Sequence, residues 1–237
     1  MSSTIIEQPK EMNKLNRNGR KRLLVITTYV CTEALLLFIA AGTLQWPEAW
    51  LYFFLRIGSM AIASFFVIRK NADIINKRGE KMADTKSWDK VFGAVYTVTI
   101  LAFPIVAGLD FRFSWSHMAL IWQIVGLIGI IPALILPYWA MSANRHFYTT
   151  VRLVEGHQVM NTGPYHYMRH PMYTGAILFS ICSPLLLGSW WALIPGGIAT
   201  LAMFVRTVLE DRTLQAELPG YADFARETRY RLVPGIW

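Results

Sequence analysis

The residues best suited to chemistry lie between positions 157 and 175, in the stretch HQVMNTGPYHYMRHPMYTG. This stretch carries three histidines, three tyrosines and one arginine, whose side chains can hydrogen-bond to a ligand or stack on it. Gly163-Pro164 and Pro171 interrupt regular structure, because a proline disfavours the helical conformation of the residue before it. A polar, aromatic segment with two chain breaks, placed between long apolar blocks, predicts a ligand site.

A second pair of chemically useful residues, Arg206 and Glu210, comes at the end of a later apolar block. Residues four apart share one face of a helix. The two side chains can form an intrahelical ion pair in which the arginine reaches the membrane interface, or both can face a bound ligand. The two interpretations are compatible with each other.

Other kinds of site have less support. His166 and His170 have the spacing of two metal ligands on a helix, but Pro171 disfavours a regular helix there. Because no nearby cysteine and no clear carboxylate completes such a site, we expect no metal. The sequence also contains no GxSxG, phosphate-loop or GxGxxG motif, which leaves serine hydrolase, phosphate-loop and classical dinucleotide sites without support.

Three motifs in the last third of the chain resemble the isoprenylcysteine carboxyl methyltransferase family. They are GPYHYMRHPMYTG, RTVLED from Arg206 to Asp211, and RYRLVPGIW at positions 229–237. Members of this family are membrane enzymes that use S-adenosylmethionine, and phospholipid N-methyltransferases are similar. The resemblance therefore implies methyl transfer to a lipophilic acceptor, either an isoprenylcysteine-like carboxylate or a phospholipid-like amine. The first 140 or so residues resemble the family only as generic membrane helices.

The resemblance also implies roles for individual residues. Arg206 corresponds to the catalytic arginine that orients the substrate, and Glu210 to an acid that binds the cofactor. Asp211 stands where the family often has a second glutamate, and its shorter side chain leaves its role open. The cofactor contacts that the resemblance implies are His157, Gln158, Val159, Met160, Tyr165, His170, Pro171, Met172, Tyr173 and Glu210.

Methyl transfer from S-adenosylmethionine is a direct in-line displacement that needs no metal and no covalent enzyme intermediate. The protein has to hold the donor, align the acceptor and exclude water, so positioning carries most of the catalysis. A carboxylate acceptor needs no general base, whereas an amine must first lose a proton. The sequence names no clear base for that step.

The composition indicates how these residues are positioned. The chain of 237 residues is 54% hydrophobic and only 16% charged, which favours an integral membrane protein. The net charge of +8 does not indicate nucleic acid, because the basic residues lie beside apolar segments, where they set topology and attract anionic lipid headgroups. We therefore expect membrane lipids as partners and no nucleic acid, and the resemblance implies a lipophilic small molecule or lipid as the substrate.

The apolar segments predict an all-α, polytopic membrane bundle with about six spans in three hairpins. We divide the chain into a basic cytosolic tail (1–22), a four-span membrane region (23–141) and a catalytic region (142–237) that holds the cofactor loop, the last hairpin and a C-terminal tail. The expected spans are 23–44, 47–68, 91–109, 118–141, 173–187 and 190–209, and the hydrophilic segment 69–90 is expected to be a loop.

Charge predicts the orientation of the bundle. Basic residues concentrate in the N-terminal tail, in 69–90, in 142–172 and in the C-terminal tail, whereas the opposite links contain only Arg112. This alternation places both termini and the site in the cytosol. Short loops and the lack of a targeting signal favour a prokaryotic inner (cell) membrane.

Two charged residues inside the first hairpin predict a contact that does not depend on the family resemblance. Glu33 and Arg56 lie midway along the first two expected spans, where an unpaired charge costs at least about 2.5 kcal/mol. Counted outward from the turn between the spans, they differ in depth by about 3 Å at most. We predict an ion pair or a shared polar network; the alternative is that each charge faces a water-filled cavity.

Two other functions compete with a methyltransferase. Membrane sterol reductases, which use NADPH, have a similar C-terminal pattern, but they usually have asparagine where this chain has Met172. A non-catalytic scaffold or transporter is the second alternative. The polar groups here cluster at one membrane face and not along a midplane path, which argues against transport.

Overall fold

The computed structural model describes residues 14–79, 86–144 and 159–237, and every regular element in these ranges is helical. This confirms the all-α prediction. The elements are α1 (Arg17–Ala41), α2 (Pro47–Asn71), α3 (Asp73–Arg78), α4 (Ser87–Phe113), α5 (Leu120–Ala143), the 3-10 helix η2 (Gly163–His166), α6 (Pro171–Leu186), α7 (Leu193–Glu217) and α8 (Tyr221–Glu227).

Five described helices, α1, α2, α4, α5 and α7, are long and apolar enough to cross a membrane. Helix α6 is apolar but has only 16 residues, which gives a length of about 24 Å at 1.5 Å per residue, short of a core of about 30 Å. The chain is therefore an integral membrane protein with a helical core.

Several boundaries differ from the sequence prediction. Helix α1 begins at Arg17, so residues 17–22 are helical and not part of a tail; the Asn16 side chain caps this start by accepting a hydrogen bond from Gly19 N. Helix α3 lies within the predicted loop 69–90. Helix α7 continues past residue 209 to Glu217, because hydropathy marks the apolar part of a helix and the first breaker, Pro219, comes later.

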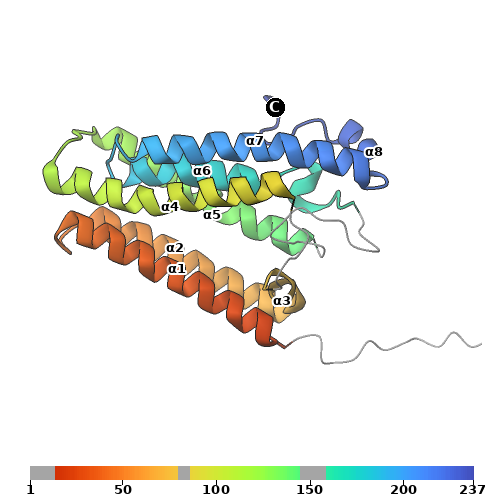
Figure 1. The fold of residues 1–237 in the computed structure, drawn as a ribbon, viewed down its shortest axis with the longest axis horizontal. Coiled ribbons are helices and arrows are strands. Elements are labelled where there is room, and N and C mark those ends of the chain that lie inside the picture. The colour runs from red at the N-terminus through yellow and green to blue at the C-terminus, as the bar shows by residue number, and fades with distance from the viewer. Residues whose placement is uncertain (1–13, 80–85, 145–158) are drawn as a thin grey trace, which may run out of the picture.

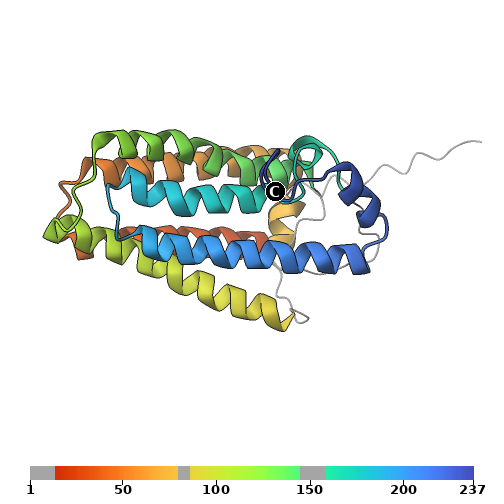
Figure 2. The ribbon, with the colours of Figure 1, turned by 90° about the horizontal axis from the view of Figure 1, so that it is seen from above.

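The helices are arranged in a bundle with two distinct ends. Figure 1 shows α1 and α2 together on one side and α4, α6 and α7 on the other, and Figure 2 shows α6 between α5 and α7. Helices α3 and α8, the beginning of α6 and the C-terminus gather at one end, which we call the site end. The α1–α2, α4–α5 and α6–α7 links lie at the opposite end.

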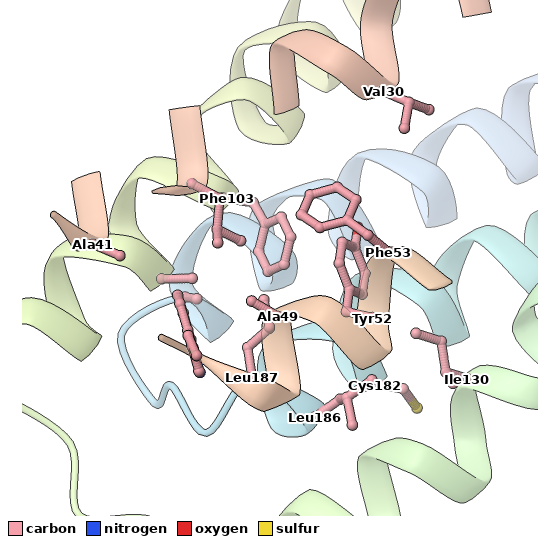
Figure 3. Packing of buried hydrophobic residues seen from close by; sticks show 14 residues of the cluster. Val30, Ala41, Ala49, Tyr52, Phe53, Phe103, Ile130, Cys182, Leu186 and Leu187 are labelled. Carbon is pink, nitrogen blue, oxygen red and sulfur yellow. The ribbon is translucent and has the colours of Figure 1, made fainter. Parts of the chain in front are cut away.

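The largest apolar cluster of buried residues joins α1, α2, α4, α5 and α6. Leu37, Tyr52 and Ile130 are fully buried in it. Figure 3 shows Tyr52 and Phe53 of α2 beside Phe103 of α4 in this core. Because α6 contributes Leu186 to the same cluster, the core fixes the helix whose first residues carry part of the predicted site.

Small residues let α5 and α6 approach closely. A Cβ added at Gly126 would lie 2.4 Å from the backbone nitrogen of Leu186, and one at Gly175 would lie 2.7 Å from the Pro137 ring. Such contacts leave no room for a side chain, as in many helix pairs in membranes. The glycines thereby let α6 pack closely against α5 near both of its ends.

The predicted pairing of Glu33 and Arg56 is confirmed. Arg56 Nη1 lies 2.9 Å from Glu33 Oε1, and the Tyr52 hydroxyl donates to the same oxygen at 2.6 Å. Glu33 is 1% exposed and Arg56 9%. The two charges therefore form a buried network that joins α1 to α2.

Candidate functional site

The described residues of the predicted site lie at or near the site end, on η2, on the beginning of α6 and on α7 (Figures 1 and 2). His157 and Gln158 lie outside the described residues. Val159 and Met160 pack with Tyr165 in an apolar cluster that α8 completes with Tyr221 and Phe224. The first part of the predicted cofactor segment is thus held by α8.

The two predicted chain breaks shape the middle of the site. Gly163 opens the 3-10 helix η2 with a φ of 62°, a left-handed conformation that glycine adopts without strain. Pro171 is the first residue of α6, and His170 precedes it as N-cap. The His170 ring stacks on that of Tyr173, with 5.5 Å between centroids and an angle of 3° between planes. The breaks therefore place an imidazole and a phenol side by side.

Arg206 and Glu210 share a face of α7, as the spacing predicts. The Tyr173 hydroxyl donates to Glu210 Oε2, and Arg206 Nε lies 3.8 Å from the same oxygen. Arg206 Nη2 lies closer, at 3.0 Å, to Oδ1 of Asp89 in the first turn of α4. The sequence analysis did not single out Asp89. The only feature that could have pointed to it is its position as an acidic residue just before an apolar block.

Aromatic rings enclose the Arg206 guanidinium. Its Cζ atom lies 4.4 Å from the centroid of Phe92 and 5.3 Å from that of Tyr173. Ring faces attract cations, so two rings and the Asp89 carboxylate fix the position of this guanidinium. The arrangement presents a positioned positive charge beside Glu210 and the first turn of α6.

Asp211, whose role the sequence left open, is a structural junction. Its side chain has no exposed surface. Arg169 Nη2 donates to Oδ2 at 3.1 Å, Arg231 Nε donates to Oδ2 at 2.9 Å, and the Tyr221 hydroxyl donates to Oδ1 at 3.0 Å. The carboxylate thus joins α7 to the loop before α6, to α8 and to the C-terminal segment.

The segment around Arg231 forms one wall of the site. The backbone N–H groups of Arg169 and His170 donate to the carbonyls of Tyr230 and Arg231, both at 2.9 Å. The Thr174 hydroxyl donates to the Leu232 carbonyl at 2.8 Å. The RYRL motif therefore acts through its backbone as well as through Arg231.

Two buried phenols keep their protons at neutral pH. Burial raises the pKa of Tyr165. Burial, together with the neighbouring Asp211 carboxylate, raises the pKa of Tyr221. Both hydroxyls are therefore hydrogen-bond donors, and Tyr221 uses its proton on Asp211.

A cavity of about 470 Å³ lies between α1, α2, α3 and α5 and reaches the beginning of α6 at Met172. A groove of about 410 Å³ between α2 and α5 borders it and shares Ala63, Val67 and Tyr138 with its lining. Polar groups in the cavity lining come from few residues. They are Arg22, Thr27, Cys31, Ser64, Arg78 and Tyr138.

The described residues contain no group of three or more histidine, cysteine, aspartate or glutamate side chains that could hold a metal ion.

Residues 124–216 match the family described as the Isoprenylcysteine carboxyl methyltransferase (ICMT) family. The matched region extends from α5 through η2 and α6 to nearly the end of α7. No curated protein matches the chain.

Proposed function

Because residues 124–216 match the isoprenylcysteine carboxyl methyltransferase family, we propose that the protein transfers a methyl group from S-adenosylmethionine to a lipophilic acceptor at the site end. One observation carries this proposal. Met172 lines the apolar cavity, while the next residue, Tyr173, contacts Glu210 and Arg206. A compartment for a lipophilic molecule therefore adjoins a polar, aromatic site.

The described residues fit this cofactor chemically. Glu210 offers a carboxylate, 17% exposed, to the positive charges of the sulfonium and the ammonium group. The parallel rings of His170 and Tyr173 offer faces for a cation or a base. The residues proposed to hold the cofactor are His157, Gln158, Val159, Met160, Tyr165, His170, Pro171, Met172, Tyr173 and Glu210.

When bound, S-adenosylmethionine supplies an activated methyl group that a nucleophile takes by in-line displacement. The protein contributes alignment and exclusion of water. We assign the alignment of the acceptor to Arg206, because Asp89, Phe92 and Tyr173 fix its guanidinium. The helices of the bundle and the α8 cluster shield this region from bulk water.

The proposed orientation places the site end in the cytosol, where S-adenosylmethionine is available. Arg17, Arg20, Lys77 and Arg78 belong to the ends of α1 and α3 at the site end, whereas Arg112 belongs to the opposite end. Positive residues favour the cytosolic side. We propose six crossings with α6 included, both termini in the cytosol, and a prokaryotic inner membrane as the location.

The test is calorimetric binding of S-adenosylmethionine, S-adenosylhomocysteine and NADPH to the purified protein in a neutral detergent. We expect the first two to bind and NADPH not to bind. A second assay measures transfer of a radiolabelled methyl group to an isoprenylcysteine analogue and to a phosphatidylethanolamine. Binding of NADPH alone would replace the proposal by a sterol-type reductase, and binding of none of the three would favour a non-catalytic scaffold or transporter.

A further inference from the structure

A small cavity of about 20 Å³ lies inside the bundle, between α1, α4, α6 and α7. The side chains around it that carry oxygen atoms are Tyr29, Glu33, Tyr96, Thr99, Ser180 and Ser183. Glu33 and Ser183 are each only 1% exposed. The cavity is therefore a buried polar site, separate from the apolar cavity at the site end.

Two buried oxygen atoms at this cavity have no hydrogen-bond partner among the described residues. Glu33 Oε1 accepts from Tyr52 and from Arg56, whereas Glu33 Oε2 has no such partner. The other atom is Ser183 Oγ of α6. A buried polar group without a partner costs free energy, and a charged group costs more. The two oxygens therefore indicate a ligand that forms hydrogen bonds with both.

Two prolines add free backbone acceptors at the same cavity. Pro104 in α4 and Pro184 in α6 have no N–H, so neither can donate to the carbonyl four residues earlier. These carbonyls belong to Ile100 and Ser180, and both residues line the cavity. The Ser180 carbonyl lies against α7, because a Cβ added at Gly196 would be 2.2 Å from its oxygen. In membrane helices, neighbouring side chains or ordered water satisfy carbonyls freed in this way.

Two hydroxyl groups at the cavity have already used their protons. Thr99 Oγ1 donates to the Tyr96 carbonyl, and Ser180 Oγ donates to the Ala176 carbonyl, both at 2.9 Å. Each of these hydroxyls can therefore only accept a hydrogen bond from a ligand. Together with Glu33 Oε2 and the freed carbonyls, they give the cavity a surplus of acceptors, which favours a small ligand that donates protons.

Size and charge favour water over a cation. A water molecule needs a cavity of at least about 10–15 Å³ on this measure, which this one provides. A sodium ion also binds oxygen atoms, but the Glu33 charge is already balanced by Arg56, whose Nη1 lies 2.9 Å away. An added cation would leave a net positive charge buried in the bundle, which is costly. Water is neutral, donates two protons and also accepts.

We propose that this cavity binds one water molecule, which donates to Glu33 Oε2 and to a freed carbonyl and shares a hydrogen bond with Ser183. The water extends the network of Glu33 and Arg56 from α1 and α2 to α6. Helix α6 also contacts this network through Phe179, whose ring centroid lies 4.8 Å from Arg56 Cζ. Because α6 begins with residues of the candidate site, the water helps to fix that helix in the bundle. The inference does not depend on the proposed function.

The direct test is an experimental structure of the purified protein at a resolution that shows ordered water, determined in sodium chloride and again in choline chloride. We expect a density peak within hydrogen-bond distance of Glu33 Oε2 and Ser183 Oγ in both salts. A peak that disappears in choline chloride would identify a sodium ion and overturn the proposal. A cavity without a peak, or a direct hydrogen bond between Glu33 and Ser183, would overturn it as well.

Ser183→Ala tests the water in solution, because the sign of its effect depends on whether the hydroxyl has a partner. If water bonds to Ser183, the variant loses a hydrogen bond, and the equilibrium constant for unfolding should rise by about tenfold. If no water is bound, the variant only removes an unsatisfied hydroxyl, and the constant should stay the same or fall. Denaturant unfolding measures the constant.

Thr200→Val on α7 is the matched control. The Thr200 hydroxyl is also buried without a partner among the described residues, but Thr200 does not line this cavity. We therefore expect Thr200→Val to leave the unfolding constant unchanged or to lower it. An unchanged or lower constant in Ser183→Ala, or an equal rise in both variants, would overturn the proposal.

Discussion

The guanidinium of Arg206 lies 3.0 Å from the Asp89 carboxylate of α4 and 3.8 Å from the Glu210 carboxylate of its own helix. The closer partner belongs to a different helix, and its side chain is only 3% exposed. Arg206 is therefore positioned by tertiary packing. If it aligns the acceptor, the α4 contact contributes to catalysis without touching the reactants.

Asp89→Asn tests this positioning role. We expect kcat to fall by about 10- to 100-fold, because small errors in alignment are costly, while the affinity for S-adenosylmethionine stays unchanged. Steady-state kinetics and calorimetry measure the two quantities. Asp223→Asn, which removes a carboxylate from an exposed ion pair on α8, serves as control. An unchanged kcat in Asp89→Asn would show that the contact with Asp89 of α4 does not position Arg206 for catalysis.

Arg206→Ala and Glu210→Ala should separate alignment of the acceptor from binding of the cofactor. We expect Arg206→Ala to lose methyl transfer and to keep its affinity for S-adenosylmethionine. Glu210→Ala should weaken that affinity by about tenfold or more, since it removes a charge proposed to face the cofactor. Calorimetry and a methyl-transfer assay provide the readouts, with Glu227→Ala, on the exposed surface of α8, as the matched control. Unaltered donor affinity in Glu210→Ala would remove its proposed role.

The buried pair of Glu33 and Arg56 should contribute to stability and not to chemistry. Removing one partner leaves the other charge buried, so Glu33→Gln and Arg56→Met should each destabilise the fold by about 3–5 kcal/mol. The double variant should lose less than the sum of the two, and the coupling should exceed about 1 kcal/mol in a double-mutant cycle. Denaturant unfolding measures these values. Purely additive effects would mean that the two charges act independently.

Asp211→Asn should detach the C-terminal wall of the site. An amide cannot satisfy Arg169, Arg231 and Tyr221 as the carboxylate does, because one of its two ends donates instead of accepting. We expect a loss of about 3–5 kcal/mol in stability and faster tryptic cleavage within residues 221–237. Glu227→Gln is again the comparison. Cleavage at the wild-type rate would show that the backbone contacts of Tyr230 and Arg231 hold the wall without Asp211.

The sequence predicted features that depend on local rules. The Gly163 and Pro171 breaks follow from backbone sterics, and the depth of Glu33 and Arg56 follows from counting along two helices joined by a short turn. The roles of Asp89 and Asp211 were missed for a different reason. Their partners lie far along the chain, and only tertiary packing brings them together. The end of α7 was also misplaced, since hydropathy falls before the helix stops.

The backbone contacts between the loop before α6 and the segment after α8 also set an order of events during synthesis. Thr174 and its acceptor Leu232 are 58 residues apart, so a ribosome adding 5–20 residues per second needs roughly 3–12 s between them. During this interval α6 and α7 can enter the bilayer while the Asp211 carboxylate still lacks Tyr221 and Arg231. The Asp211 junction is thus completed last, when this late segment folds back onto α6 and α7.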